Sequence, residues 1–265
     1  MNRMLGANCE CIRGMDSTET LKLMREVGFD SFFSGASTYA GVEKVRKAGD
    51  ALGMTLTSLH APFKGINDLW THGMNYRPLY KRILECIDAA ASNGVPVVVV
   101  HISSGWFPPE LCDIGFARYD ELVSYAADKG VKVAFENLRL TGNVAYFADR
   151  YRKVENVGFC LDVGHEHCYT KNVTFMDIFG ERLLATHIHD NFGISKPYEE
   201  NTDIHYLPFD GTVDYSKFMA KANQYGYAGP LTLEISNGTK PEYGEMEPIE
   251  FLKTAFERLE RISKL

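Results

Sequence analysis

Short apolar or β-branched runs alternate with longer amphipathic runs along the whole chain. Gly, Asn or Asp marks most of the changes from one kind of run to the other, as turns and helix ends require. The pattern predicts eight strands that alternate with helices. The predicted strands cover residues 4–9, 30–34, 55–60, 96–102, 132–136, 158–162, 184–189 and 231–235.

The longer runs have the spacing of amphipathic helices. In DSTETLKLMREVG, Asp16 can cap the start of a helix and Gly28 can end it in a left-handed turn. The other helical runs show the same amphipathic spacing, and each except the last ends at a glycine. These runs are VEKVRKAGDALG, YKRILECIDAAASNG, YDELVSYAADKG, YSKFMAKANQYG and PIEFLKTAFERLERISKL.

Strands that alternate with helices predict parallel pairing through right-handed crossovers. Eight such units in 265 residues match the usual size of a closed (β/α)8 TIM barrel. An open, doubly wound sheet is the alternative, but no GxGxxG follows the first predicted strand. No linker interrupts the pattern, so we expect a single TIM-barrel domain over residues 1–265. The longest connection, 190–214, is expected to be functional.

The composition, with 45% hydrophobic and 24% charged residues, fits a globular chain with one large core. The net charge of -7 disfavours a broad nucleic-acid-binding surface. The first residues contain no apolar signal region, and no run approaches the roughly 18 apolar residues of a membrane span. We therefore expect a cytoplasmic protein without a membrane partner. Six cysteines without a CxxC pair predict mostly reduced, buried thiols.

Polar residues collect where the predicted strands end. In a TIM barrel the active site lies at the carboxyl ends of the strands, so these residues should meet. Burying so many imidazoles and carboxylates without a cation would cost several kcal/mol for each uncompensated charge. We therefore expect a divalent metal, with Zn, Mn, Co or Fe favoured over Ca, and Mg less suited to the mixed ligands. The residues are His60, His101, Glu136, Asp162, His165, His187 and Glu234.

The long connection adds two candidate ligands in the run ENTDIHYLPFDG. Asp203 and His205 are separated by one residue, so in an extended segment both side chains can point to the same side and close the site. The alternative is that they are solvated loop residues. His189 shares the face of His187 and is expected beside the ligands or in the core.

Other residues near the predicted site are expected to support it. Asn137 and Asp190 should orient ligands, whereas His72 and His167 are expected to be structural. Phe63 and Trp106 lie in the predicted loops at the barrel mouth, and we expect them to bind substrate by stacking on a sugar ring. A hydrophobic lid that packs on itself is the alternative for these aromatic side chains.

The motifs LHAP, VVVHIS, AFENL, CLDVGH, HIHDN, DIHYLPFDG and TLEIS, in this order, span nearly the whole chain. Together they resemble the xylose isomerase-like superfamily of TIM barrels, which joins sugar isomerases and epimerases with endonuclease IV-type DNA-repair enzymes. The resemblance implies that Glu136, Asp162, His187 and Glu234 hold the metal in an isomerase or epimerase. In the endonuclease members, a trinuclear zinc site also uses the positions of His60, His101, His165, Asp203 and His205.

The chain differs from one branch of this superfamily at one position. Ketose 3-epimerases of this superfamily carry an arginine a few residues past the histidine of the seventh strand, where this chain reads HDNFGIS. This difference weighs against a free ketohexose as the substrate.

We expect a metal-dependent isomerase or epimerase that acts on a sugar or sugar phosphate. Glu136 and Glu234 arise from strands far apart in the ring, so one can remove a proton beside a carbonyl and the other can return it, while the metal stabilises the enediolate. The alternative is an endonuclease IV-like zinc phosphodiesterase that acts on abasic DNA. The presence of all nine residues of the trinuclear site favours it. Against it, the loops at the mouth offer only scattered cations to hold phosphates: Lys64, Arg139, Lys171, Lys196 and Lys240.

Two other functions and the oligomeric state stay open. Another metal-dependent reaction, such as a dehydration, would use the same ligands. A non-catalytic sugar-binding barrel is disfavoured by the intact pair Glu136 and Glu234. The sequence is compatible with a homo-oligomer and does not fix the oligomeric state.

Overall fold

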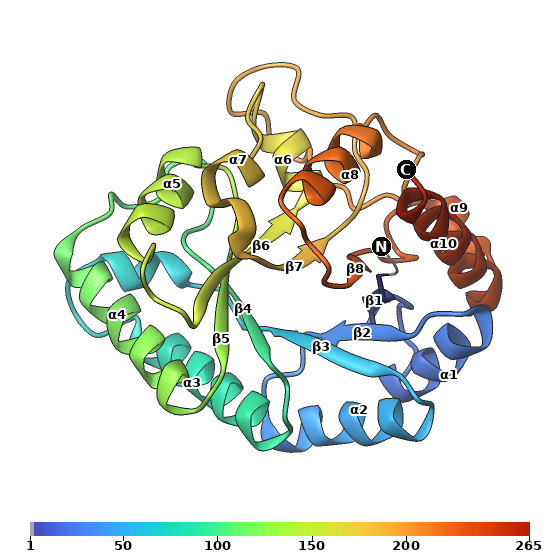
Figure 1. Ribbon diagram of the computed structural model, residues 1–265, viewed down its shortest axis with the longest axis horizontal. Helices are drawn as coiled ribbons and strands as arrows, with labels where there is room; N and C mark the ends of the chain where they lie inside the picture. The colour runs from blue at the N-terminus through green and yellow to red at the C-terminus, as the bar shows by residue number, and fades with distance from the viewer. Residues whose placement is uncertain (1–2) are drawn as a thin grey trace.

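The computed structural model describes residues 3–265, in which eight parallel strands form one sheet surrounded by helices (Figure 1). The strands follow one another in space in the order β7-β6-β5-β4-β3-β2-β1-β8. This is the (β/α)8 TIM barrel that the alternating pattern predicts. The strands are β1 (Leu5–Asn8), β2 (Ser31–Ser34), β3 (Thr55–His60), β4 (Val97–His101), β5 (Lys132–Glu136), β6 (Val157–Asp162), β7 (Leu183–His187) and β8 (Leu231–Leu233).

The barrel closes between β7 and β8 through a short parallel bridge. Ile188 pairs with Leu233, its amide donates to the carbonyl of Thr232 (2.9 Å), and its carbonyl accepts from the amide of Glu234 (3.0 Å). Because these two bonds continue the sheet past the end of β7, the ring of strands is complete. The bridge also fixes the backbone at Glu234.

All eight predicted strands are present, and the predicted bounds of β3 and β5 agree at both ends. The largest differences lie at β7 and β8, which end two residues earlier than predicted. Beyond His187 the chain makes only the bridge at Ile188, and Asp190 then pairs with Tyr206 of the long connection. The backbone there therefore pairs with the loop at the barrel mouth and does not continue the β-ladder.

The first helix begins and ends as predicted. Asp16 caps α1 (Ser17–Val27) by accepting from the amide of Thr18 (3.0 Å), and Gly28 has a φ of 120°. The ring of Phe256 lies where a Cβ at Gly28 would be, so a side chain there would also clash. The remaining long helices on the outside are α2 (Tyr39–Ala51), α3 (Arg77–Ser92), α4 (Asp113–Asp128), α5 (Thr141–Arg150), α8 (Tyr215–Gln224) and α10 (Pro248–Ser263).

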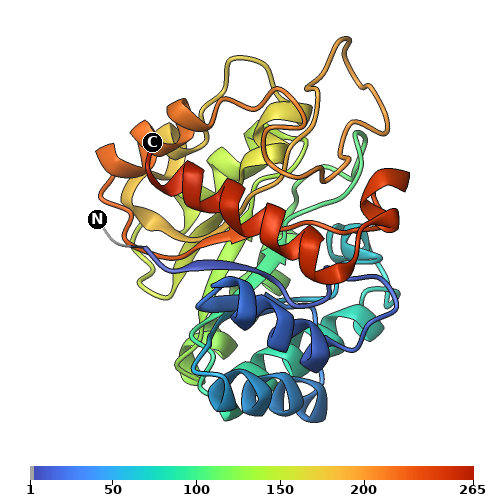
Figure 2. The same cartoon turned by 90° about the vertical axis from the view of Figure 1, so that its right-hand side faces the viewer.

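Several short helices were not among the predicted runs. The most important is α6 (Val163–Tyr169), which starts directly after β6 with Asp162 as its capping residue. The others are η1 (Ile66–Trp70), α7 (Met176–Phe179), η2 (Gly180–Arg182) and α9 (Pro241–Glu245). Figure 2 shows α10 lying across α1, and the long connection between β7 and α8 rising above the rim of the barrel.

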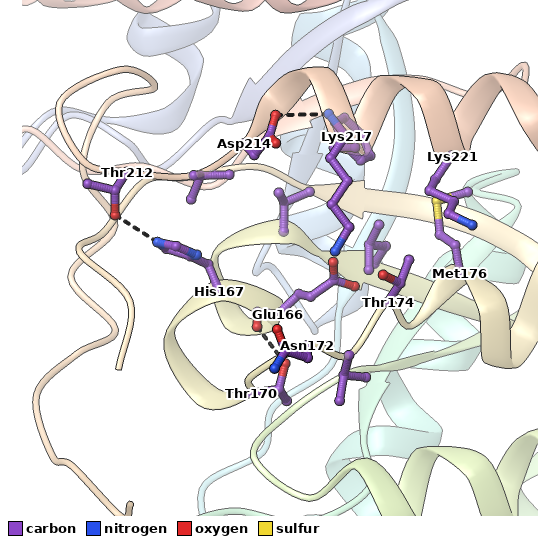
Figure 3. A pocket seen from close by; sticks show the side chains of 15 residues that line it. Glu166, His167, Thr170, Asn172, Thr174, Met176, Thr212, Asp214, Lys217 and Lys221 are labelled. Atoms are coloured by element: carbon purple, nitrogen blue, oxygen red, sulfur yellow. Dashed lines mark hydrogen bonds between the residues drawn. The ribbon is translucent and has the colours of Figure 1, made fainter. Parts of the chain in front are cut away.

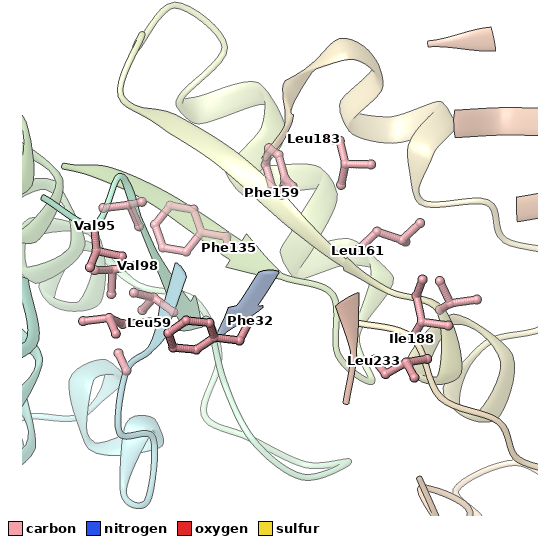
Figure 4. Packing of buried hydrophobic residues seen from close by; sticks show 14 of the residues in the cluster. Phe32, Leu59, Val95, Val98, Phe135, Phe159, Leu161, Leu183, Ile188 and Leu233 are labelled. Carbon is pink, nitrogen blue, oxygen red and sulfur yellow. The ribbon is translucent and has the colours of Figure 1, made fainter. Parts of the chain in front are cut away.

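The buried apolar residues form two layers on the two faces of the strands. Val98 and Val100 belong to the large cluster between strands and helices, part of which Figure 4 shows around Phe32, Phe135 and Phe159. Val97 and Val99 belong to a separate small cluster with Ala134, Cys160 and Ala185. The alternation along β4 therefore assigns the small cluster to the barrel interior.

Two further sequence expectations concern thiols and membranes. All six cysteines are free thiols and all except Cys112 are buried, as the absence of CxxC pairs predicted. Among the helices of residues 3–265, none combines the length and the apolar character that a membrane span needs.

Candidate metal centre and active site

The strands deliver the predicted ligands to one end of the barrel. Five of these residues are the last residues of their strands, and Glu234 directly follows β8. Because parallel strands end at the same rim, the side chains form a ring at the barrel mouth. The five are His60 on β3, His101 on β4, Glu136 on β5, Asp162 on β6 and His187 on β7.

The central group of the ring consists of Glu136, Asp162, His187 and Glu234. Each offers one ligand atom, and these atoms lie within 4.8 Å of one another. Nδ1 of His187 is 3.3 Å from Oε1 of Glu136 and 3.4 Å from Oε2 of Glu234. Two ligand atoms that each lie about 2.1 Å from a tetrahedral cation are about 3.4 Å apart. The spacing in the central group therefore suits one cation.

Three further groups of candidate ligands overlap or adjoin the central one, and one of them, His60, His187 and Glu234, shares two residues with it. In the second group, Oε2 of Glu136 is 3.1 Å from Nε2 of His60 and 2.9 Å from Nε2 of His101. In the third group, Oδ2 of Asp203 is 3.1 Å from Nε2 of His165, and Oδ1 is 3.0 Å from Nε2 of His205. The structure thus brings together every ligand residue that the sequence suggested, and Glu136 belongs to two of the groups.

Asp162 provides the test of whether a cation fits. Its side chain is fully buried, and its Oδ2 has no hydrogen-bond partner among residues 3–265. Leaving a buried carboxylate oxygen unpaired is costly, and a divalent cation in the central group would compensate it. The donor set of three carboxylates and one imidazole suits Zn, Mn or Co. The residues present therefore fit a divalent metal.

The side chains of the ring shift one another's protonation. Burial by itself would raise the pKa of Glu136, but His101 and His187 hold it well below its ordinary value. Burial would lower the pKa of His165, yet Asp162 and Asp203 raise it to about 10. Burial would also lower the pKa of His205, but Asp203 and Glu234 raise it to about 9. Without a metal, protons on these imidazoles balance the carboxylates, so a metal and protons compete for the site.

Asn137 holds the ends of two neighbouring strands together. Its Nδ2 donates to the carbonyl of Asp162 (2.8 Å), and its Oδ1 accepts from the amide of Asp162 (2.7 Å). The carboxylate of Asp162 also accepts from the amide of His165 (2.6 Å) and so caps α6. Asn137 therefore orients a candidate ligand through its backbone, in the supporting position that the sequence suggested.

Asp190 fixes the long connection to the barrel. Its carboxylate accepts from the amides of Phe209 (2.8 Å) and Val213 (3.1 Å), and its backbone pairs with Tyr206. The segment in between places Asp203 and His205 over the ring. His205 has a φ of 44°, which is uncommon for a residue with a side chain. Long-range hydrogen bonds thus hold this loop in a conformation that local preference would not favour.

His189 lies beside the ligands, as the period of two along β7 suggested. Its Nε2 is 3.1 Å from Oδ1 of Asp162 and 3.5 Å from Oδ1 of Asp203, and its ring stacks on that of His205 at 3.9 Å. Gly164 makes room for it, because a Cβ at that position would come within 2.0 Å of the imidazole. His189 therefore connects the central and third groups and is itself a candidate ligand of the third.

The two aromatic residues expected to contact substrate lie in different places. Phe63 stacks on His101 at 4.2 Å, is 45% exposed, and lines the cavity of about 270 Å³ that opens onto the ring. Trp106 is buried and lines an adjacent cavity with Tyr169 and Tyr198. Its Nε1 donates to the carbonyl of Glu199 (3.1 Å). Phe63 is thus placed to touch a substrate at the ring, and Trp106 lies one cavity away.

Tyr169 and Arg139 also line the ring cavity, and the sequence alone did not assign them to it. The hydroxyl of Tyr169 donates to Oδ2 of Asp203 (3.0 Å), and its ring stacks on that of His165 at 5.0 Å. Residues 165 and 169 are one helical turn apart, so recognising α6 would have placed them on one face. Arg139 was noted only as a scattered cation at the mouth.

A further cavity of about 160 Å³ lies away from the ring, beside α6, α7 and α8 (Figure 3). Glu166 and His167 project into it, and Nε2 of His167 lies 2.8 Å from Oγ1 of Thr212. A carboxylate oxygen of Glu166 accepts from the amide of Phe175 (2.7 Å). These contacts tie α6 to its neighbours, which agrees with the structural role expected of His167.

The chain resembles two curated relatives and many solved structures, which include the two named below. Protein y4fM of Sinorhizobium fredii is 28% identical, with 81% of this chain and 79% of the relative covered. MJ1311 of Methanocaldococcus jannaschii is 27% identical, with 68% of this chain covered and only 64% of the relative. The zinc-bound IolI protein (TM-score 0.76, 17% identity, 98% and 97% covered) and the 3-keto-D-glucoside 4-epimerase YcjR of E. coli (TM-score 0.72, 18%, 98% and 99%) share the fold.

A protein-family model also matches most of the chain. The family described as xylose isomerase-like TIM barrel matches residues 21–255, which includes all the ring residues described above. Together with the eight-stranded barrel, this match shows that the chain belongs to the xylose isomerase-like TIM-barrel family.

Proposed function

We propose that the protein is a divalent-metal-dependent isomerase or epimerase that acts on a sugar or sugar phosphate by proton transfer. The observation that carries this proposal is the central group, in which carboxylate oxygens of Glu136 and Glu234 lie 3.3 and 3.4 Å from Nδ1 of His187. The zinc-bound IolI protein and the 3-keto-D-glucoside 4-epimerase, which share the fold, support a reaction of this class.

The two glutamates differ in access to the cavity. The side chain of Glu136 is 1% exposed and is surrounded by imidazoles, whereas that of Glu234 is 22% exposed. Both carboxyl groups have a lowered pKa: burial opposes this shift, but neighbouring histidines including His187 outweigh it. Both are therefore ionised at neutral pH and able to accept a proton.

Proton transfer at a carbon beside a carbonyl needs a base on the face where the proton leaves and an acid on the face where it returns. Glu234, the more accessible carboxylate, removes the proton in our proposal and later releases it to solvent. For an epimerisation, Glu136 first takes up a proton from solvent, and its acid form then donates that proton to the opposite face of the carbon. A metal held by Glu136, Asp162, His187 and Glu234 would supply the electrophile that offsets negative charge on the substrate oxygen. For a 1,2-isomerisation, Glu234 alone can move the proton between adjacent carbons.

Exchange of carbon-bound hydrogen with solvent tests this function. Protein loaded with Zn, Mn or Co is incubated in deuterated water with a panel of ketoses, ketose phosphates and keto-glucosides, and deuterium is located by NMR. We expect incorporation at the carbon next to the carbonyl, with less for internal transfer in a 1,2-isomerase. Exchange should be lost in Glu234→Gln and retained in the surface variant Glu43→Gln. Absence of exchange with the whole panel would contradict the proposal.

Phosphodiester hydrolysis at abasic DNA is the second candidate, and a specific observation favours it. The second and third groups, with His60 and His101 on one side and His165, Asp203 and His205 on the other, offer ligands for additional metals. The net charge of -7 argues against a surface along which a duplex could lie. Metal-dependent nicking of abasic DNA that is lost in Glu136→Gln would favour this candidate over the isomerase.

A further inference from the structure

Arg139 is a cation of the ring cavity with unused hydrogen-bonding capacity. It follows β5 by three residues and lines the cavity together with Glu136, His165, Asp203 and other ring residues. Its Nε is buried without a hydrogen-bond partner. Among residues 3–265, no carboxylate lies within 4.0 Å of its guanidinium nitrogens, and no protein group accepts a hydrogen bond from them. An arginine in such a place offers donors to whatever enters the cavity.

Aromatic rings hold the guanidinium in place without occupying its N–H groups. Its central carbon lies 4.2 Å from the centre of the Tyr169 ring and 5.7 Å from that of Trp106. A cation stacked on ring faces keeps its in-plane donors free for a planar or tetrahedral anion. Tyr169 also donates to Asp203 (3.0 Å), so Arg139 is positioned relative to the third group.

A carboxylate or a phosphate suits these donors best, because arginine binds both through paired, charge-assisted hydrogen bonds. A neutral hydroxyl would leave the positive charge of this half-buried side chain uncompensated. A second pair of cations, Lys64 and Arg82, lines an adjoining groove that shares His60, Phe63 and Glu234 with the ring cavity. Both side chains are exposed, so water can accept their hydrogen bonds. The buried, unpaired Nε of Arg139 makes that residue the better candidate for binding an anion.

We propose that Arg139 is a specificity-determining residue that binds an anionic group on the substrate, and that the protein therefore acts on acidic sugars, either sugar phosphates or sugar acids, in preference to neutral sugars. This inference rests on the proposed function for the site that it extends.

Three polyols that differ at one carbon test the proposal without turnover, because none has an aldehyde or ketone group. They are D-glucitol, D-glucitol 6-phosphate and L-gulonate, which carry a hydroxymethyl group, a phosphate and a carboxylate at the same position. Their dissociation constants are measured by calorimetry on the metal-loaded protein, on Arg139→Gln, on Arg139→Lys and on the control Arg82→Gln. Thermal melting and metal content confirm that each variant is folded and loaded.

We expect the wild-type protein to bind at least one anionic polyol on the order of 10–100-fold more tightly than D-glucitol. Whichever anion is preferred identifies the substrate class. Arg139→Gln should reduce the preference to less than about 3-fold without weakening D-glucitol, Arg139→Lys should keep part of it, and Arg82→Gln should leave it unchanged.

Three results would overturn the proposal: no preference in the wild-type protein, an unchanged preference in Arg139→Gln, or a preference that disappears only in Arg82→Gln. A preference that survives Arg139→Gln and vanishes on chelation would assign the anion to the metal. Deuterium exchange reports on the proposed function separately. Exchange without any Arg139-dependent preference defeats only this inference, and the preference without exchange defeats only the proposed function.

Discussion

Nδ1 of His187 lies 3.3 Å from Oε1 of Glu136, although 51 residues separate them in the chain. The other carboxylate oxygen of Glu136 is 2.9 Å from Nε2 of His101. One carboxylate thus faces two groups of candidate ligands and occupies the middle of the ring. Glu136 is also almost fully buried, so its environment is set by the protein and not by water.

Glu136→Gln and Glu234→Gln should each lower turnover by a factor on the order of 10²–10⁴, because a neutral amide cannot transfer the proton. The amide has nearly the same shape as the carboxylate, so circular dichroism and chromatographic behaviour should match the wild-type protein. Activity is measured with whichever substrate shows deuterium exchange. Substantial turnover by either variant would contradict the two-base mechanism.

Asp162→Asn should empty the central group of metal while preserving the local structure. Asn caps helices about as well as Asp, so the start of α6 is expected to persist. The metal loses one of the negative charges that attract it, and its content per chain should fall in elemental analysis after dialysis. Asp50→Asn, which changes only an exposed ion pair with Arg46, is the matched control. Equal metal content in both variants would argue against Asp162 as a ligand.

Metal affinity at the third group should rise with pH. Burial opposes protonation of both imidazoles, but the carboxylates raise the pKa of His165 to about 10 and that of His205 to about 9. Below these values both carry a proton that a metal must displace, so affinity should increase about tenfold per pH unit for each proton released and level off near the pKa values. Calorimetry in two buffers between pH 6 and pH 8 measures this proton release. A pH-independent affinity at this group would refute the competition.

Gly164→Ala should disturb the contact between α6 and His189. The added Cβ would come within 2.0 Å of the imidazole ring. Overpacking of this kind lowers the free energy of unfolding by about 1–3 kcal/mol. Gly142→Ala is the control, because no atom lies within 4 Å of its added Cβ and it sits in a helix. Chemical denaturation should separate the two variants, and identical stabilities would show that α6 can shift at no cost.

The barrel and most of the ring were predictable from the sequence for one physical reason. The alternation of apolar and amphipathic runs indicates parallel strands, and parallel strands in a barrel end at one rim. The residues that end β3 to β7 therefore had to meet, whatever their detailed packing. His60 and Asp162 are examples. They are 102 residues apart in the chain, and their positions at strand ends were enough to predict that both lie at the barrel mouth.

Other parts of the site depend on contacts that no local pattern encodes. Asp203 and His205 reach the ring because Asp190 binds the amides of Phe209 and Val213, and these hydrogen bonds join segments far apart in the chain. Arg139 acquires its position from the rings of Tyr169, the last residue of α6, and Trp106, in the loop after β4. Such long-range contacts, unlike strand ends, leave no periodic signal.

The central claim is that Glu136, Asp162, His187 and Glu234 hold one divalent metal. Anomalous diffraction at the absorption edge of the metal, from crystals of metal-loaded protein, tests it most directly. We predict that the strongest peak lies about 2.0–2.3 Å from Nδ1 of His187 and from a carboxylate oxygen of each of the three acids. Peaks confined to the second and third groups, or no peak at the central group in metal-replete crystals, would contradict the claim.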